Sequence, residues 1–113
     1  VSRFGLRAGR REGLTGVWLP QGKLCAIGAA VRHWITFHGL ALNVSGDLEP
    51  FALIDPCGLG QLGVTSMAAA MGREVDMAQV RAAVVQSFAE VFDFAPEVAS
   101  AAGSAEHLAA LRR

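Results

Sequence analysis

Residues 23–58 constrain the fold most, because short β-prone runs alternate there with glycine and proline turns. Lys23 opens the apolar run KLCAIGAAV, and at the other end Cys57 stands between Pro56 and Gly58. Proline fixes its own φ and restricts the residue before it, so a stiff turn carries the thiol of Cys57. The pattern favours a sheet of short strands with a candidate reactive group at each end of the stretch.

A β-hairpin is predicted at the start of this stretch. Residues 20–22, a proline, a glutamine and a glycine, separate the β-prone run 16–19 from the run 23–31. Side chains alternate along a strand, which predicts Lys23 and Cys25 on the same face. Beyond Lys23 both faces are apolar or small, so we expect this strand to be buried on both sides, in a sheet between helices.

The rest of the chain predicts another strand and several helical segments. Residues 32–37 indicate a turn leading into a short strand, and residues 38–44 a further strand. Gly39 interrupts that strand, at a point where a neighbour or ligand comes close to the backbone. Residues 48–54 favour a single helical turn with Phe51, Leu53 and Ile54 packed inward. The succession of strands and helices predicts an α/β fold.

Two helices are predicted in the second half of the chain. Residues 64–71 read as a strand leading into a helix, which Gly72 ends as a C-terminal cap. Asp76 is a good N-cap for the clearest helix, in which apolar residues recur every three or four positions. Pro96 is predicted to end this helix.

The composition argues against two classes of protein. Ten basic and ten acidic residues give a formal net charge of zero, so no long-range field attracts nucleic acid or an anionic membrane. Hydrophobic residues make up 52% of the sequence, but no apolar run approaches the ~20 residues that span a bilayer. No secretory leader pattern is seen, and we expect a cytoplasmic protein whose two cysteines are free thiols.

Lys23 and Cys57 are candidate partners. A free thiol has a pKa of about 8.5, so a nucleophilic cysteine needs a neighbour that favours the thiolate. An ammonium within ~4 to 6 Å does this by Coulomb attraction, and the amine can also move protons. The alternatives are an exposed turn lysine and a small buried cysteine, since the separation in sequence does not by itself bring the two together.

Other polar residues have ordinary interpretations beside the functional ones. Arg7, Arg10 and Arg11 lie in the glycine-rich start of the chain, where they would either grip a phosphate or belong to a solvated loop. His33 and His38 lie in the central stretch, where core or turn histidines are the ordinary expectation. No histidine and carboxylate set in this pattern competes with the lysine and cysteine.

Three blocks of the sequence strengthen the hypothesis of a lysine and cysteine pair: GVWLPQGKLCAIG, RHWITFHGLALNV and DLEPFALIDPCG. In order and internal spacing they resemble three consecutive blocks of the octanoyltransferases, also called lipoyl(octanoyl) transferases or lipoate-protein ligase B. The similarity runs from about residue 16 to Cys57 and continues more loosely to about Phe94.

The resemblance implies an acyltransferase that moves an octanoyl group from acyl carrier protein to a lysine of a lipoyl domain. Cys57 corresponds to the cysteine that carries the acyl-thioester, and Lys23 to the lysine that lowers the pKa of that cysteine. The blocks that line the acyl tunnel correspond to Ala26, Ile27, Gly28, Gly39, Leu40 and Ala41. An eight-carbon chain suits such a narrow apolar groove of small residues.

The resemblance also implies the fold and the partners. The family has a mixed β-sheet flanked by helices, shared with biotin and lipoate protein ligases. Residues 1–96 correspond to the C-terminal part of the catalytic domain, a partial domain, and residues 97–113 to an alanine-rich tail. The implied partners are octanoyl-acyl carrier protein and the lipoyl domains of 2-oxoacid dehydrogenase complexes and the glycine cleavage H protein, with no nucleic acid or membrane. Since no glycine-rich phosphate loop is seen, we expect transfer without ATP, cofactor or metal.

Two blocks that complete the acyl site upstream in the family, arginine-glycine-glycine and histidine-glycine-proline-glycine, do not occur in this sequence. We therefore expect the chain to begin inside a longer domain, and these residues alone to associate and to be nearly inactive. One alternative is a non-catalytic module that docks carrier or lipoyl domains. Another is a thiol redox protein using Cys25 and Cys57, although the sequence has no C-x-x-C pair.

Overall fold

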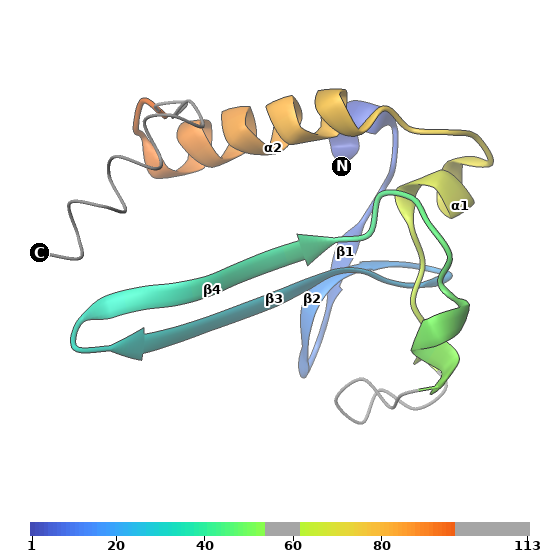
Figure 1. The fold of residues 1–113 in the computed structure, drawn as a ribbon, viewed down its shortest axis with the longest axis horizontal. Helices are drawn as coiled ribbons and strands as arrows, with labels where there is room; N and C mark the ends of the chain where they lie inside the picture. The colour runs from blue at the N-terminus through green and yellow to red at the C-terminus, as the bar shows by residue number, and fades with distance from the viewer. Residues whose placement is uncertain (54–61, 97–113) are drawn as a thin grey trace, which may run out of the picture. The chain divides into compact units, whose positions relative to one another are not determined.

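The computed structural model describes residues 1–53 and 62–96. The chain divides into two compact units, Val1–Val80 and Arg81–Arg113, each described here by itself. The first unit contains an antiparallel sheet in the order β1-β2-β3-β4, so neighbours in the sheet are also neighbours in the sequence (Figure 1). Its strands are β1 (Gly9–Arg11), β2 (Leu14–Leu19), β3 (Gly22–Arg32) and β4 (Ile35–Leu42).

All three turns of the meander close on two residues, and the first joins Arg11 to its partner Leu14. Leu19 pairs with Gly22 around Pro20 and Gln21, which confirms the predicted hairpin. Arg32 pairs with Ile35 around His33 and Trp34, whose φ angles are 50° and 63°. Two consecutive positive φ values are typical of a type I′ turn, whose twist matches that of the flanking strands. The strand predicted at 38–44 therefore begins earlier, at Ile35.

The β3–β4 hairpin has a buried root and an exposed arm. We define the root as residues 22–25 of β3 with Leu42 of β4, and the arm as residues 26–32 and 35–41. In the root Leu24 is fully buried and Cys25 is 4% exposed. In the arm Ile27 is 45% exposed and Leu40 52% exposed. The prediction that β3 is buried on both sides is therefore correct for the root and wrong for the arm.

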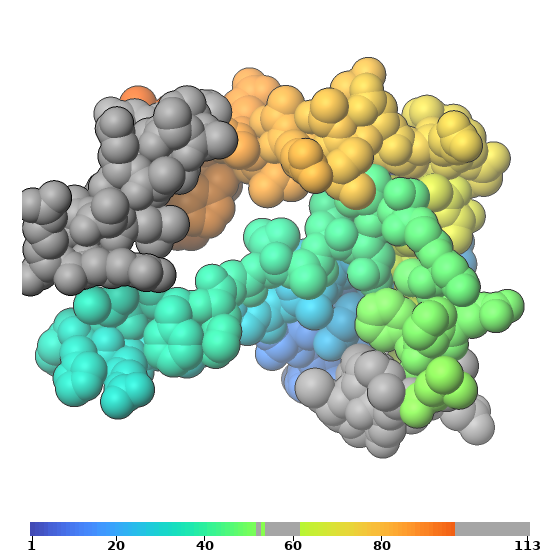
Figure 2. Space-filling model, in the orientation of Figure 1, coloured from blue at the N-terminus to red at the C-terminus, as the bar shows by residue number. Residues whose placement is uncertain are grey.

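The figures show why the two parts differ. In Figure 1 the arm runs beyond the ends of β1 and β2, so only β3 and β4 pair there. From the side shown in Figure 2, the outer end of the arm (turquoise) has no cover from β1 or β2. A two-stranded ribbon buries side chains only where another element covers it. The apolar residues of the arm are therefore exposed within this unit.

Hydrogen bonds join the root to the chain that follows it. Asn43 N donates to Leu24 O (3.0 Å), which continues the sheet past β4. The amide of Met67, the first residue of α1 (Met67–Met71), donates to Asn43 O (2.9 Å). Ser66 caps this helix by accepting from Ala69 N, and Gly72 ends it with φ 64°, as predicted.

The described part of the first unit also contains the 3-10 segments η1 (Ser2–Phe4) and η2 (Glu49–Leu53). The latter confirms the single helical turn predicted at 48–54. Its side chains do not pack inward as predicted, because Leu53 is 87% exposed and Phe51 is also exposed. Ile54, the third residue of that prediction, lies outside the described residues.

The helix α2 (Met77–Phe92) begins in the first unit and continues into the second. Ala78 N donates to Asp76 Oδ1 (2.8 Å), which confirms Asp76 as the predicted cap. The helix ends at Phe92, before the predicted stop at Pro96, and Asp93 follows with φ 51°. In the second unit Phe88 contacts the rings of Phe92 and Phe94, with centroid distances of 4.4 and 5.6 Å.

The described helices and sheet confirm the α/β class. The described sheet is antiparallel rather than mixed, with one isolated parallel bridge between Lys23 and Val64, and together with the helices it is consistent with part of the expected ligase-like catalytic fold. Among residues 1–53 and 62–96, no helix has both the length and the hydropathy needed to cross a membrane.

Candidate functional site

Lys23 lies in the root, where β3 has β2 on one edge and residues 63–65 on the other. Its Cα partner in β2 is Trp18. On the other edge of β3 its amide donates to Gly63 O (3.1 Å), and its carbonyl accepts from Thr65 N (3.0 Å). Both backbone polar groups of Lys23 are thus bonded to residues 63–65, which follow the segment containing Cys57. The backbone of Lys23 is therefore fixed, and its side chain is half-buried.

A register shift decides the face on which Lys23 lies. Trp18 pairs with Lys23, but Val17 pairs with Cys25, so β3 has one extra residue between these two pairs. Val17 and Trp18 are adjacent and point to opposite faces, hence their partners do too. Lys23 therefore shares the face of Trp18, and Cys25 the face of Val17. The prediction that Lys23 and Cys25 share one face is wrong, because the bulge reverses the alternation.

Contacts of the side chains agree with this assignment. The Nζ of Lys23 lies 5.0 Å from the ring centroid of Trp18. A Cβ added to Gly16, which shares the face of Trp18, would lie 3.2 Å from Lys23 Cε. Gly16 has φ 132° and the same Cβ would lie 2.6 Å from Cys25 O, so a side chain there would displace the strand. The stem of Lys23 thus crosses the surface that Gly16 leaves open.

Cys57 belongs to residues 54–61, which lie outside the described residues, so its pairing with Lys23 stays a prediction. Cys25, in contrast, is described and is a free thiol. Burial raises the pKa of Cys25, partly offset by a backbone hydrogen bond with Ala41 and the positive charge of the Val1 amino group. A buried thiol with a raised pKa is a poor nucleophile. Cys25 is therefore poorly suited to act as a nucleophile.

The six residues predicted to line an acyl groove form consecutive cross-strand pairs: Ala26 with Ala41, Ile27 with Leu40, and Gly28 with Gly39. Because the bulge sets Cys25 on the face of Val17, the alanine and glycine pairs lie on the face of Lys23. A Cβ added to Gly28 or Gly39 would meet nothing within 4 Å. The structure thus brings four of the six residues together on one face of the arm and puts Ile27 and Leu40 on the opposite face, and the role of all six in binding stays a prediction.

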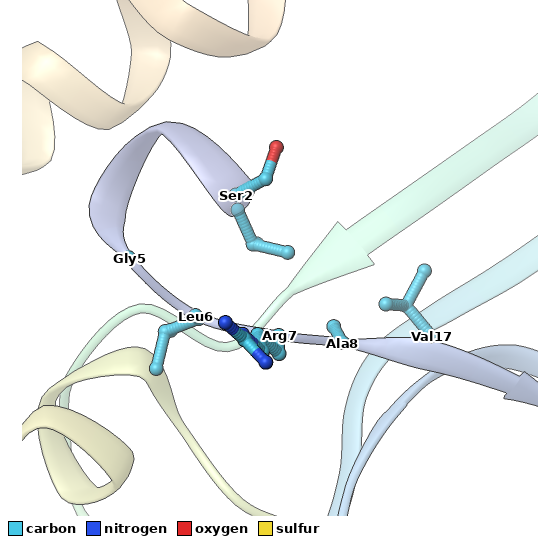
Figure 3. Close-up of a pocket in the computed structure, with 7 residues that line it drawn as sticks. Ser2, Gly5, Leu6, Arg7, Ala8 and Val17 are labelled. Atoms are coloured by element: carbon cyan, nitrogen blue, oxygen red, sulfur yellow. The ribbon is translucent and has the colours of Figure 1, made fainter.

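Arg7 and Arg11, two of the three arginines at the start of the chain, lie apart. Arg11 lies with its Cζ 4.8 Å from the ring centroid of Trp18, and its Nη2 donates to Leu19 O (3.4 Å). Arg7 instead lines an open pocket of about 690 Å³ together with Ser2 and Val17, on the opposite face of the sheet (Figure 3). The two guanidinium groups therefore do not converge on a common phosphate.

The two described histidines, His33 and His38, are both exposed on the β3–β4 hairpin. His33 forms the type I′ turn, and His38 has φ 72° within β4, where its ring lies 4.5 Å from that of Phe37. Among residues 1–53 and 62–96, no group of three or more histidine, cysteine or acidic side chains could hold a metal ion.

Gly16 and Trp18, which lie beside the side chain of Lys23, were not among the predicted site residues. A signal for Trp18 was present, because a two-residue turn at Pro20 and Gln21 pairs Leu19 with Gly22 and the preceding Trp18 with Lys23. For Gly16 no sequence signal distinguishes a glycine that faces a lysine stem from a glycine in a loop.

Comparison with known proteins gives the family. The profile described as "Lipoyl protein ligase A/B catalytic domain" matches residues 1–89. A relative from Caldanaerobacter subterraneus subsp. tengcongensis named "Octanoyltransferase" is 51% identical over 93 residues, which are 82% of this chain and 40% of the relative. Relatives of the same name from Syntrophotalea carbinolica and Geobacter metallireducens are 52% identical over 84 residues and 45% identical over 93 residues.

These two alignments cover 74% and 82% of this chain, and 40% and 44% of the relatives. The chain thus spans less than half the length of the curated relatives it matches. The profile match covers most of the chain, including the sheet, the root and α1. The chain belongs to the family of lipoyl protein ligase A/B catalytic domains.

Proposed function

We propose that this chain contributes the thiol and the amine of an octanoyltransferase. In this proposal Cys57 carries an octanoyl group as a thioester between acyl carrier protein, the donor, and a lysine of a lipoyl domain, the acceptor. The relatives named octanoyltransferases support it, since their alignments cover 74 to 82% of the chain at 45 to 52% identity. The matched range of the family profile contains both Lys23 and Cys57.

The observation that carries the proposal is the pairing of residues 63–65 with Lys23. Gly63 follows Cys57 by six positions (63 minus 57) and accepts the hydrogen bond of the Lys23 amide. Gly22 makes this pairing possible, because a Cβ there would lie 2.9 Å from the carbonyl carbon and oxygen of Gly63. Close backbone approach at this point is what a site shared by the two segments needs.

The proposed chemistry balances with these two groups alone. The Lys23 ammonium stabilises the Cys57 thiolate, which attacks the carbonyl carbon of the octanoyl thioester on the carrier. A new carbon–sulfur bond forms, the bond to the carrier sulfur breaks, and Lys23 gives its proton to the departing carrier thiolate. Because the acyl group arrives as a thioester, activation by ATP is not needed.

The second transfer restores the starting state. The neutral amine of the lipoyl-domain lysine attacks the thioester on Cys57, a carbon–nitrogen bond forms, and the Cys57 sulfur departs as thiolate. The proton lost by the attacking amine passes to the neutral Lys23 amine, which becomes an ammonium again. The ion pair is regenerated without any net change in the enzyme.

The arm supplies the proposed surface for the acyl chain. Ala26, Gly28, Gly39 and Ala41 share the face of Lys23 and leave open space above the sheet. A linear acyl chain can lie against such a surface in van der Waals contact because no side chain stands in its way. Larger apolar side chains, Ile27 and Leu40, lie on the opposite face.

The test measures acylation of the complete gene product that carries this sequence. After incubation with octanoyl-acyl carrier protein, mass spectrometry should find one octanoyl group on the peptide containing Cys57. Cys57→Ser should abolish this adduct, whereas Cys25→Ser is the matched control and should keep it. Lys23→Arg keeps a positive charge but loses the proton transfer, so turnover should fall by roughly 10²-fold or more.

The same experiment separates the alternatives. Binding of the carrier protein without any adduct on Cys57 would favour a docking module and refute the transferase. An adduct on Cys25 that survives Cys57→Ser would reverse the assignment of the two cysteines.

A further inference from the structure

The side chain of Lys23 is guided by β2. Its stem passes over Gly16 and its ammonium lies over the ring of Trp18, so two residues of one strand determine its course. Gly16 precedes Val17, the partner of Cys25, and the strands are antiparallel. The stem therefore runs along β3 from the row of Lys23 toward the row where the alanine and glycine pairs of the arm begin.

Trp18 is itself held in place. Its side chain is only 3% exposed. Arg11 contacts the same ring from β1, on the other side of β2 from β3, and is tied to the backbone by its hydrogen bond to Leu19 O. The negative face of an indole ring attracts both cations, while the cations repel each other. The Arg11 guanidinium thus disfavours movement of the Lys23 ammonium across the ring toward β1.

We propose that Trp18 is a positioning residue that holds the amine of Lys23 at the edge of the small-residue face. This deepens the proposed function and rests on it for its catalytic meaning. In this scheme Trp18 takes no part in the bond-making steps and acts through Lys23. Arg11 keeps the ring of Trp18 in place, and Gly16 leaves the path of the lysine stem open.

The indole N–H of Trp18 suits a conservative test. This Nε1 is buried and has no hydrogen-bond partner within the described residues, 1–53 and 62–96. Trp18→Phe therefore keeps an aromatic face under the ammonium without removing a hydrogen bond that the described residues make. Trp18→Leu removes the aromatic face. The contrast between the two variants isolates the interaction of the ring with Lys23 from the filling of space.

The first measurement does not depend on activity. In the complete gene product, acetic anhydride at trace level labels accessible amines, and peptide mapping by mass spectrometry quantifies the label on Lys23, the only lysine of this sequence, as a fraction of the total label incorporated. In Trp18→Leu the labelled fraction at Lys23 should rise about two- to five-fold, the range expected when a partly exposed cation leaves a ring. Trp18→Phe should stay within about two-fold of the wild type.

Trp34→Leu is the matched control. It makes the same chemical change at a side chain that is 97% exposed at the outer end of the arm. It should leave the labelling of Lys23 unchanged. Unchanged labelling in Trp18→Leu, or an equal rise in Trp34→Leu, would overturn the proposal.

A second measurement remains if Trp18→Leu does not fold. In the Trp34→Leu background Trp18 is the one tryptophan left of the two in this sequence, and subtracting the emission of the Trp18→Phe variant in the same background isolates the emission of Trp18. Lys23→Met should then shift the emission of Trp18, because a charge leaves the ring. Arg73→Met, at an exposed arginine outside the sheet, should not. An unchanged emission after Lys23→Met would show that the amine does not rest on the ring.

Activity separates this proposal from the proposed function. The rate of octanoyl-adduct formation should fall in Trp18→Leu and recover in Trp18→Phe. If no adduct forms in any variant but labelling responds to Trp18, the positioning stands and the transferase does not. If the adduct forms equally fast in Trp18→Leu and labelling is unchanged, the transferase stands and the positioning role is refuted.

Discussion

The root and the arm belong to the same pair of strands but differ in what surrounds them. In the root, β3 has β2 on one edge and Asn43 with residues 63–65 on the other, and Leu24 is fully buried. In the arm, β3 has only β4 as a partner, and Ile35 is 69% exposed. The two parts share backbone conformation and apolar composition, so neighbours rather than sequence pattern decide burial.

This difference predicts that substitutions in the root and in the arm change different properties of the protein. Side chains of the root contribute to folding because water leaves them, whereas those of the arm keep most of their exposure in both states. In the proposed reaction the root holds the amine and the arm offers the acyl surface. A substitution in the root should therefore change the free energy of unfolding, and one in the arm should change transfer.

The largest expected effect is that of Leu24→Ala in the root. Truncating a fully buried leucine removes buried apolar surface and leaves a cavity, which costs about 2 to 5 kcal/mol. Urea denaturation followed by circular dichroism measures this loss. In a small unit a cost of this size is a large fraction of the total stability.

Leu40→Ala is the matched substitution in the arm. Because this side chain is 52% exposed, its truncation should cost less than about 1 kcal/mol. Equal losses for the two variants would mean that the arm is covered in the folded protein to the same extent as the root, and the comparison would fail.

A smaller effect is expected for Gly22→Ala. Gly22 has φ 151°, and a Cβ there would lie 2.9 Å from the backbone of Gly63. The added methyl group must push residues 63–65 away from Lys23, with strain of about 1 to 3 kcal/mol. The thermal midpoint should fall, and protection of the Lys23 amide against hydrogen exchange should fall with it.

Gly39→Val makes the corresponding change on the arm, where a Cβ would meet nothing within 4 Å. Valine suits an exposed strand, so the free energy of unfolding should stay within about 0.5 kcal/mol of the wild type. If the proposed acyl surface is correct, octanoyl transfer should nevertheless decrease. A parallel loss of stability and transfer would assign Gly39 to packing instead.

The local features of the fold, its turns and helix ends, could be predicted well from the sequence. Pro20 and Gln21 were sufficient to predict the hairpin of β2 and β3, and Asp76 and Gly72 marked a helix start and a helix end, because turns and caps depend on nearby residues. The resemblance to a family grouped Ala26–Gly28 with Gly39–Ala41 as the lining of one groove. These residues do pair across the arm, but the resemblance did not predict the pairing itself.

Two kinds of feature could not be predicted from the sequence. One is the burial of a segment, which depends on the elements that cover it, and the other is the insertion of a single extra residue into a strand. The bulge that separates the faces of Lys23 and Cys25 leaves no signature in side-chain type, so simple alternation gave the wrong face. The exposure of the arm and of Leu53 depends on which elements cover them, and an apolar run does not specify its cover. Cys57 lies outside the described residues, and its partner stays a prediction.

The smallest expected effect concerns Cys25 and pH. Burial raises the pKa of this thiol, so the folded state holds its proton more tightly than the unfolded state does. The contribution of Cys25 to stability is therefore complete below the unfolded pKa of about 8.5 and is lost as pH rises through the higher folded pKa.

Urea midpoints at pH 7, 8, 9 and 10 should fall more steeply for the wild type than for Cys25→Ala. Cys57→Ser in both backgrounds removes the other thiol from the comparison. Parallel curves would mean that the thiol of Cys25 titrates alike in both states, and the burial of the root around it would then have to be less complete than that around Leu24.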